Sequence, residues 1–160
     1  MPAARESSAS KEALGAAAAC VRRGDFEAAL AQLKALLALD PRHELATGML
    51  AGLYAQLNMP ERAQHYYEQV LRLNPANDLA RFQLGLLQFE SGQPQEALET
   101  WKPEVAKPQD YVIHFHCALA HLKLKRRDEA AKLLERAAQY MPRDHLLYPQ
   151  LERLRQPLDS

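Results

Sequence analysis

The chain has 160 residues, of which 48% are hydrophobic, so we expect a folded domain with a substantial core and exclude general disorder. Lys plus Arg and Asp plus Glu both number 20, so the formal net charge is zero. Because contacts to phosphates need a basic excess, we do not expect a nucleic-acid partner.

The lengths of the apolar stretches and the spacing of the two cysteines further restrict the class of protein. No stretch approaches the roughly 18 consecutive apolar residues that a membrane-spanning helix needs, so membrane insertion is not expected. Cys20 and Cys117 lie too far apart to suggest a disulfide framework. A cytoplasmic protein without a cofactor fits this composition best.

The predicted elements begin after a polar stretch at residues 1–9, which we interpret as a flexible N-terminal tail. From residue 10 on, apolar residues recur at helical spacing in paired segments. The predicted helices span residues 11–23, 26–39, 43–57, 60–73, 77–90, 94–102, 110–124 and 127–140. A last segment, within residues 143–160, carries four leucines at helical spacing and is predicted to be a capping helix and tail. The helix is expected to start at Asp144 or, since Pro149 would strain its interior, at Pro149 instead.

Three sets of residues recur along these helices with spacings of 34, 34 and 33. One set is invariant alanine, one is bulky and one is small. They are Ala29, Ala63, Ala97 and Ala130; Leu33, Tyr67, Trp101 and Leu134; and Ala17, Ala51, Gly85 and Ala118. Small residues allow two helix backbones to approach closely, and the bulky residues fill the space between them.

Turn and breaker residues occupy fixed places in each copy. Gly24 and Gly92 follow first helices, where a left-handed residue ends a helix well. In the fourth copy Lys125 stands at this place, which predicts a less regular turn. In the third copy Pro103 falls inside the second helix, so we expect that helix to end early and an extended link to run over residues 102–109.

This pattern resembles the tetratricopeptide repeat over residues 10–142. The resemblance implies an all-α, right-handed α-solenoid of four helix-turn-helix repeats closed by a capping helix. The repeat boundaries are residues 10–43, 44–77, 78–110 and 111–142.

In this family the first helices line a concave groove that holds a partner. Carried over to this chain, the resemblance implies a groove of mostly apolar residues: Leu45, Gly48, Gly52, Leu79, Phe82, Leu86, Phe89, Val112, Phe115, Leu119 and Leu122. The two glycines either leave room for the backbone of a ligand or serve close helix packing, and the sequence does not choose between these readings.

The function predicted from this groove is non-enzymatic. We expect an adaptor or chaperone that binds an apolar or amphipathic peptide segment, and groove chemistry and size are similar to bacterial type III secretion translocator chaperones. The alternative is a self-associating structural module, a homo-oligomer within a larger assembly. His114, Cys117 and His121 share one helix face and are a third hypothesis, a metal site, although they occupy packing positions of the repeat.

Overall fold

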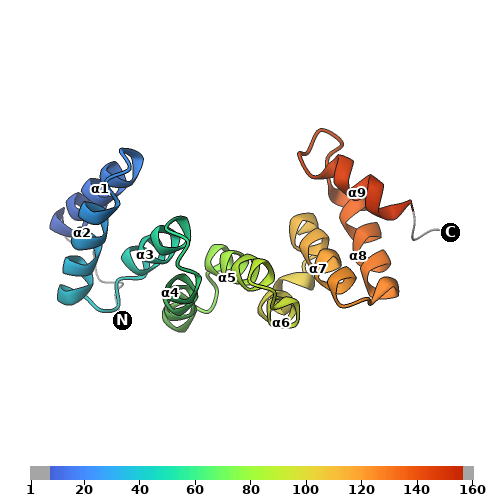
Figure 1. Ribbon diagram of the computed structural model, residues 1–160, viewed down its shortest axis with the longest axis horizontal. Coiled ribbons are helices and arrows are strands. Elements are labelled where there is room, and N and C mark those ends of the chain that lie inside the picture. Colours follow the sequence, from blue (N-terminus) through green and yellow to red (C-terminus); the bar gives the residue numbers. More distant parts are fainter. Residues whose placement is uncertain (1–7, 157–160) are drawn as a thin grey trace. The chain divides into compact units, whose positions relative to one another are not determined.

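The computed structural model describes residues 8–156, and this part of the chain folds into α-helices joined by short turns (Figure 1). The helices are α1 (Ser8–Arg22), α2 (Phe26–Leu39), α3 (Glu44–Gln56), α4 (Pro60–Leu73), α5 (Asp78–Glu90), α6 (Pro94–Val105), α7 (Tyr111–Lys123), α8 (Arg127–Tyr140) and α9 (Tyr148–Arg155). They divide between two compact units, Met1–Ala80 and Arg81–Ser160. The predicted all-α class is confirmed.

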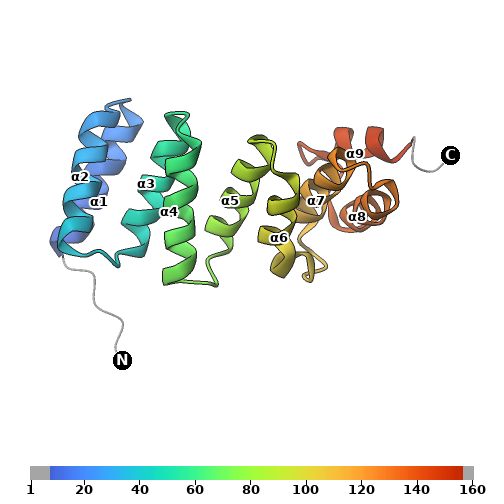
Figure 2. The same cartoon turned by 60° about the horizontal axis from the view of Figure 1, so that its bottom comes forward.

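Within each unit, helices that follow one another in the sequence pack as helix-turn-helix pairs (Figure 2). In the first unit α1 packs on α2 and α3 on α4, and α2 also contacts α3. In the second unit α7 packs on both α6 and α8, and α9 packs on α8. This sequential packing is the arrangement that the repeat predicted.

The burial pattern confirms the repeat register. All four alanines of the invariant set are completely buried, as are the small residues Ala17, Ala51 and Ala118. Each residue of the bulky set is also buried, with Trp101 and Leu134 fully removed from solvent. The spacing read from the sequence therefore marks positions that are buried in every repeat.

The turn between the two helices of each pair has the same backbone geometry in all four copies. The residues with positive φ are Gly24 (77°), Asn58 (55°), Gly92 (80°) and Lys125 (59°). The next residue's N–H bonds to the carbonyl five residues before it, from Asp25 to Cys20, Met59 to Tyr54, Gln93 to Gln88 and Arg126 to His121, at 2.8–2.9 Å. This is the Schellman helix ending. The expected irregularity at Lys125 is absent, because the lysine adopts the left-handed conformation that glycine adopts elsewhere.

The prediction that Pro103 ends α6 early was wrong, since the helix continues to Val105 with Pro103 inside it. Its last turn is held from two sides. The buried Glu104 carboxylate forms ion pairs with Arg81 Nε at 3.4 Å and with Lys107 Nζ at 2.5 Å. The Val105 carbonyl lies 3.0 Å from His114 Nε2 on α7. These contacts offset the hydrogen bond that proline cannot donate.

The two chain ends differ in part from the prediction. Helix α1 begins at Ser8, so residues 8 and 9 are helical, while residues 1–7 of the predicted tail lie outside the described residues. Of the two predicted starts of the last helix, Asp144 is wrong, whereas Pro149 is one residue from the observed start of α9 at Tyr148. Leu151 is fully buried, and Arg155 bonds both Glu135 oxygens on α8 at 2.7 and 3.0 Å, which fixes α9 on α8.

The left-handed lysine generates a first prediction. Lys125→Gly should stabilise the second unit by about 1 kcal/mol, because glycine adopts positive φ without the steric cost that a side chain brings. Urea unfolding followed by fluorescence of Trp101, the single tryptophan, measures the change. The matched control is Lys132→Gly on the exposed side of α8, which should destabilise by about 1 kcal/mol. If both variants changed the free energy of unfolding in the same direction, the role assigned to the left-handed turn would be contradicted.

Gly85 generates a second prediction. A Cβ at this position would overlap the indole of Trp101, whose Nε1 donates a hydrogen bond to the Phe82 carbonyl at 3.2 Å. Gly85→Ala should therefore destabilise by about 2 kcal/mol through overpacking. Gly15→Ala, at a helical glycine with open space around it, should instead stabilise by about 0.5–1 kcal/mol. Equal unfolding midpoints for Gly85→Ala and the native chain would contradict the close contact.

Candidate functional site

In the second unit, α5 and α7 bring their predicted groove residues side by side. The Lys123 ammonium lies 4.1 Å from the centre of the Phe89 ring and 3.5 Å from the Phe89 carbonyl oxygen. A cation–π contact thus joins α5 and α7 at the end where Phe89 and Lys123 lie. At the other end, the rings of Phe82 and His116 meet at 5.5 Å.

Most predicted groove residues of this unit keep part of their surface exposed. They are only partly covered, and all but the valine pack against the buried core from its edge: Phe82, Leu86, Phe89, Val112, Leu119 and Leu122. An apolar surface of this kind, contributed by two neighbouring helices, is what a docked apolar segment would need.

Phe115 is the exception, and its prediction as a groove residue is corrected. Its side chain is 1% exposed and belongs to the same buried cluster as Leu151 of α9. The segment after α8 folds back over this side of α7, where the rings of Tyr111 and His145 meet at 5.3 Å. Tyr111 precedes Phe115 by about one helical turn, so the two residues lie on the same face of α7.

In the first unit the predicted groove residues range from open to half-buried. Leu45 is 53% exposed and Leu79 is 69% exposed. A Cβ at Gly48 would lie 3.8 Å from Val70 and one at Gly52 would lie 3.7 Å from Tyr67, both ordinary contacts. Packing therefore does not require glycine at these positions, and the reading as close helix packing loses its support.

The residues considered for metal binding serve other contacts. His114 is fully buried and bonded to the Val105 carbonyl, and burial raises the pKa of the Cys117 thiol to about 12. Burial also lowers the pKa of His121, with Glu129 acting to raise it and Arg126 to lower it. Across residues 8–156 no group of three His, Cys, Asp or Glu residues is placed to hold a metal ion.

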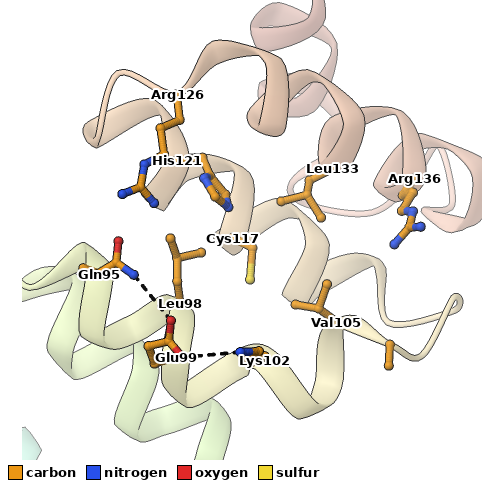
Figure 3. Close-up of a pocket in the computed structure, with 11 residues that line it drawn as sticks. Gln95, Leu98, Glu99, Lys102, Val105, Cys117, His121, Arg126, Leu133 and Arg136 are labelled. Carbon is orange, nitrogen blue, oxygen red and sulfur yellow. Dashed lines mark hydrogen bonds and ion pairs between the residues drawn. The ribbon is translucent and has the colours of Figure 1, made fainter.

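Sequence reasoning missed a pocket of about 470 Å³ between α6, α7 and α8 (Figure 3). Its lining combines apolar, basic and amide side chains from these three helices and the turns beside them. The lining residues are Gln95, Leu98, Glu99, Lys102, Val105, Ala106, Cys117, His121, Arg126, Leu133 and Arg136. The irregularity at Pro103 was the signal available in the sequence, but it was interpreted as the early end of a helix.

None of the helices in the described part of the chain is long and apolar enough to cross a membrane.

Comparisons with known proteins agree with this fold. A family model described as "Anaphase-promoting complex, cyclosome, subunit 3" matches residues 56–137, just over half of the chain, and one described as "Tetratricopeptide repeat" matches residues 21–66. No curated protein matches the sequence.

Several solved structures resemble the chain in fold at low sequence identity. MamA 41-end from Desulfovibrio magneticus RS-1 is 20% identical with a TM-score of 0.81, covering 97% of this chain and 92% of that one. A MamA RS-1 double mutant gives 20% identity and a TM-score of 0.80, covering 97% of each chain. PilW, titled a widely conserved type IV pilus biogenesis factor, is 22% identical with a TM-score of 0.76, and the match covers 96% of this chain and 71% of that one.

Proteins built from such repeats act as scaffolds for interactions with other proteins and are generally not enzymes. Four copies of the same helix pair, the same turn in each copy and the two matching family models lead to one conclusion. The chain belongs to the tetratricopeptide repeat family.

Proposed function

We propose that this protein binds an apolar or amphipathic segment of a partner protein through the exposed faces of its first helices. The observation that carries the proposal is the surface on α5 and α7, where six apolar side chains remain partly exposed beside one another. Leu45 and Leu79 add two strongly exposed leucines on first helices of the repeat. Partly exposed apolar clusters of this kind commonly mark binding surfaces.

The energetics favour reversible binding. The six side chains on α5 and α7 are already partly covered, so completing their burial yields roughly 0.7 kcal/mol each, or about 4 kcal/mol in total. Association costs about 4–15 kcal/mol in lost freedom. A segment held by this surface alone would therefore bind weakly and reversibly.

A second candidate function is self-association, and a specific observation favours it. Two of the most exposed leucines lie away from the first helices: Leu39 at the end of α2 and Leu146 in the turn before α9. Exposed apolar residues near the ends of a repeat array are candidates for contact with a second copy.

The docking proposal predicts the behaviour of matched variants. The double variant Leu45→Asp, Leu79→Asp should fold normally, because both side chains are already largely in water, and should lose most co-purifying partner protein, about tenfold or more. Leu39→Asp introduces the same charge at an 86% exposed leucine outside the proposed surface and should retain the partners. Quantitative mass spectrometry of tagged full-length chains measures the difference. Leu122→Asp places the same charge on the partly exposed surface of α5 and α7 and should also lose the partners, and retention of every partner by both variants would contradict the proposal.

Self-association makes a separate prediction. If the exposed leucines at Leu39 and Leu146 join two copies, sedimentation velocity should show mass increasing with protein concentration, and Leu39→Asp with Leu146→Asp should restore a monomer. The Leu45→Asp, Leu79→Asp chain serves as the control and should sediment like the native protein. A native chain that stays monomeric at all concentrations excludes this second function.

A further inference from the structure

The pocket between α6, α7 and α8 lies away from the surface proposed for docking. On α7 it is lined by Cys117 and His121, whereas the surface residues on that helix are Val112, Leu119 and Leu122. At 3.6 residues per turn these two sets lie about 160° apart around the helix axis. The pocket is therefore a separate feature on the opposite side of α7.

The floor of the pocket is apolar. Leu98 and Val105 of α6, Cys117 of α7 and Leu133 of α8 all border it (Figure 3). Cys117 and Leu133 are buried, and the pKa of the thiol is raised, so the sulfur is present as an uncharged thiol. Sites that hold ligands commonly have a volume of about 300–1,000 Å³ and are lined mainly by apolar groups, and this pocket fits both descriptions.

The rim of the pocket is basic. Lys102, Arg126 and Arg136 border it, against a single carboxylate, Glu99, which already pairs with Lys102 at 3.8 Å. Within residues 8–156 neither arginine forms an ion pair, and both are exposed. The pocket therefore presents two free guanidinium groups, which suit carboxylate oxygens.

A polar group at the pocket also lacks a partner. The Nδ1 atom of His121 is buried and forms no hydrogen bond within the described part of the chain. Burial lowers the pKa of this imidazole, so the ring is neutral at neutral pH. Depending on the tautomer, Nδ1 can then accept one hydrogen bond from a backbone N–H or donate one to a backbone carbonyl. A neighbouring hollow beside α8 contains Glu129 and Glu135 as well as Lys132 and Arg136, so it has no comparable preference for anions.

We propose that this pocket is a second binding site, which takes a short extended acidic segment of a partner protein whose apolar side chains enter between α6 and α8. The two arginines lie toward opposite ends of the pocket (Figure 3). Arg126 is the N-cap of α8 and Arg136 lies ten residues further on, which corresponds to about 15 Å at 1.5 Å per residue. An extended chain covers this distance in about five residues, so the matching segment has two carboxylates about five positions apart around an apolar centre.

The test uses a defined probe, the peptide acetyl-EALLAE-amide, titrated into the full-length ¹⁵N-labelled chain. We expect saturable amide shifts at Leu98, Cys117, His121 and Leu133, with a dissociation constant on the order of 1 mM. Two control peptides separate the contributions of charge and apolar contact. Acetyl-KALLAK-amide reverses the charge and acetyl-EASSAE-amide removes the leucines, and both should bind at least about fivefold more weakly.

Matched protein variants complete the test. Arg126→Glu with Arg136→Glu should weaken acetyl-EALLAE-amide by about tenfold or more, since attraction becomes repulsion at both ends. Arg127→Glu makes the same change next to Arg126 but outside the pocket lining and should bind like the native chain. All three changes are at exposed positions, and circular dichroism checks that the variants are folded.

Three results would overturn the proposal. The first is equal binding of the acidic and basic peptides, and the second is an absence of shifts at the pocket amides at saturating peptide. The third is loss of a concentration-dependent oligomer in Arg126→Glu, Arg136→Glu without any change in peptide binding, which would assign the pocket to a second copy of the chain. The outcome of this peptide test does not depend on the docking surface proposed on the first helices. The Leu45→Asp, Leu79→Asp variant, which alters that surface, leaves every pocket residue in place.

Discussion

The close approach of paired helices is the constraint on which this structure depends. Small residues on the first helices allow the two backbones to approach closely, and among the glycines of the chain Gly85 has the closest neighbour, the indole of Trp101. The indole occupies the space that a methyl group would need and also binds the Phe82 carbonyl.

Much of the fold could be predicted from the sequence, because repetition compensates for weak local signals. Ala29, Ala63, Ala97 and Ala130 are individually uninformative, but their common spacing identified buried positions that the structure confirms. Local propensity was less reliable. A proline normally indicates a helix end, yet Pro103 is tolerated because tertiary contacts of Glu104 and Val105 hold the turn around it. At Lys125 the geometry of the turn overrode the preference of the residue.

The candidate site was predicted less completely than the fold. Family positions pointed to first-helix residues, some of which, such as Leu79, are exposed, but they carry no information on the segment beyond the last repeat. Phe115 is buried in a cluster that also contains Leu151 of α9, a long-range association that spacing within the repeat does not encode. The pocket escaped prediction for a related reason. It arises from the separation of α6 and α8 across α7, and each of its lining residues looks ordinary in the sequence.

The chain has two cysteines, and both are free and buried, one in each compact unit. Cys20 accepts weak hydrogen bonds from Arg23 and Gln32, at 3.4 and 3.8 Å, and Cys117 lies in the core of the other unit. A thiol reagent reaches such a sulfur only when its surroundings open, so alkylation rates report local opening. Each compact unit therefore has one native cysteine whose alkylation rate reports how often that unit opens. Mass spectrometry of the two labelled peptides measures both rates without an engineered probe.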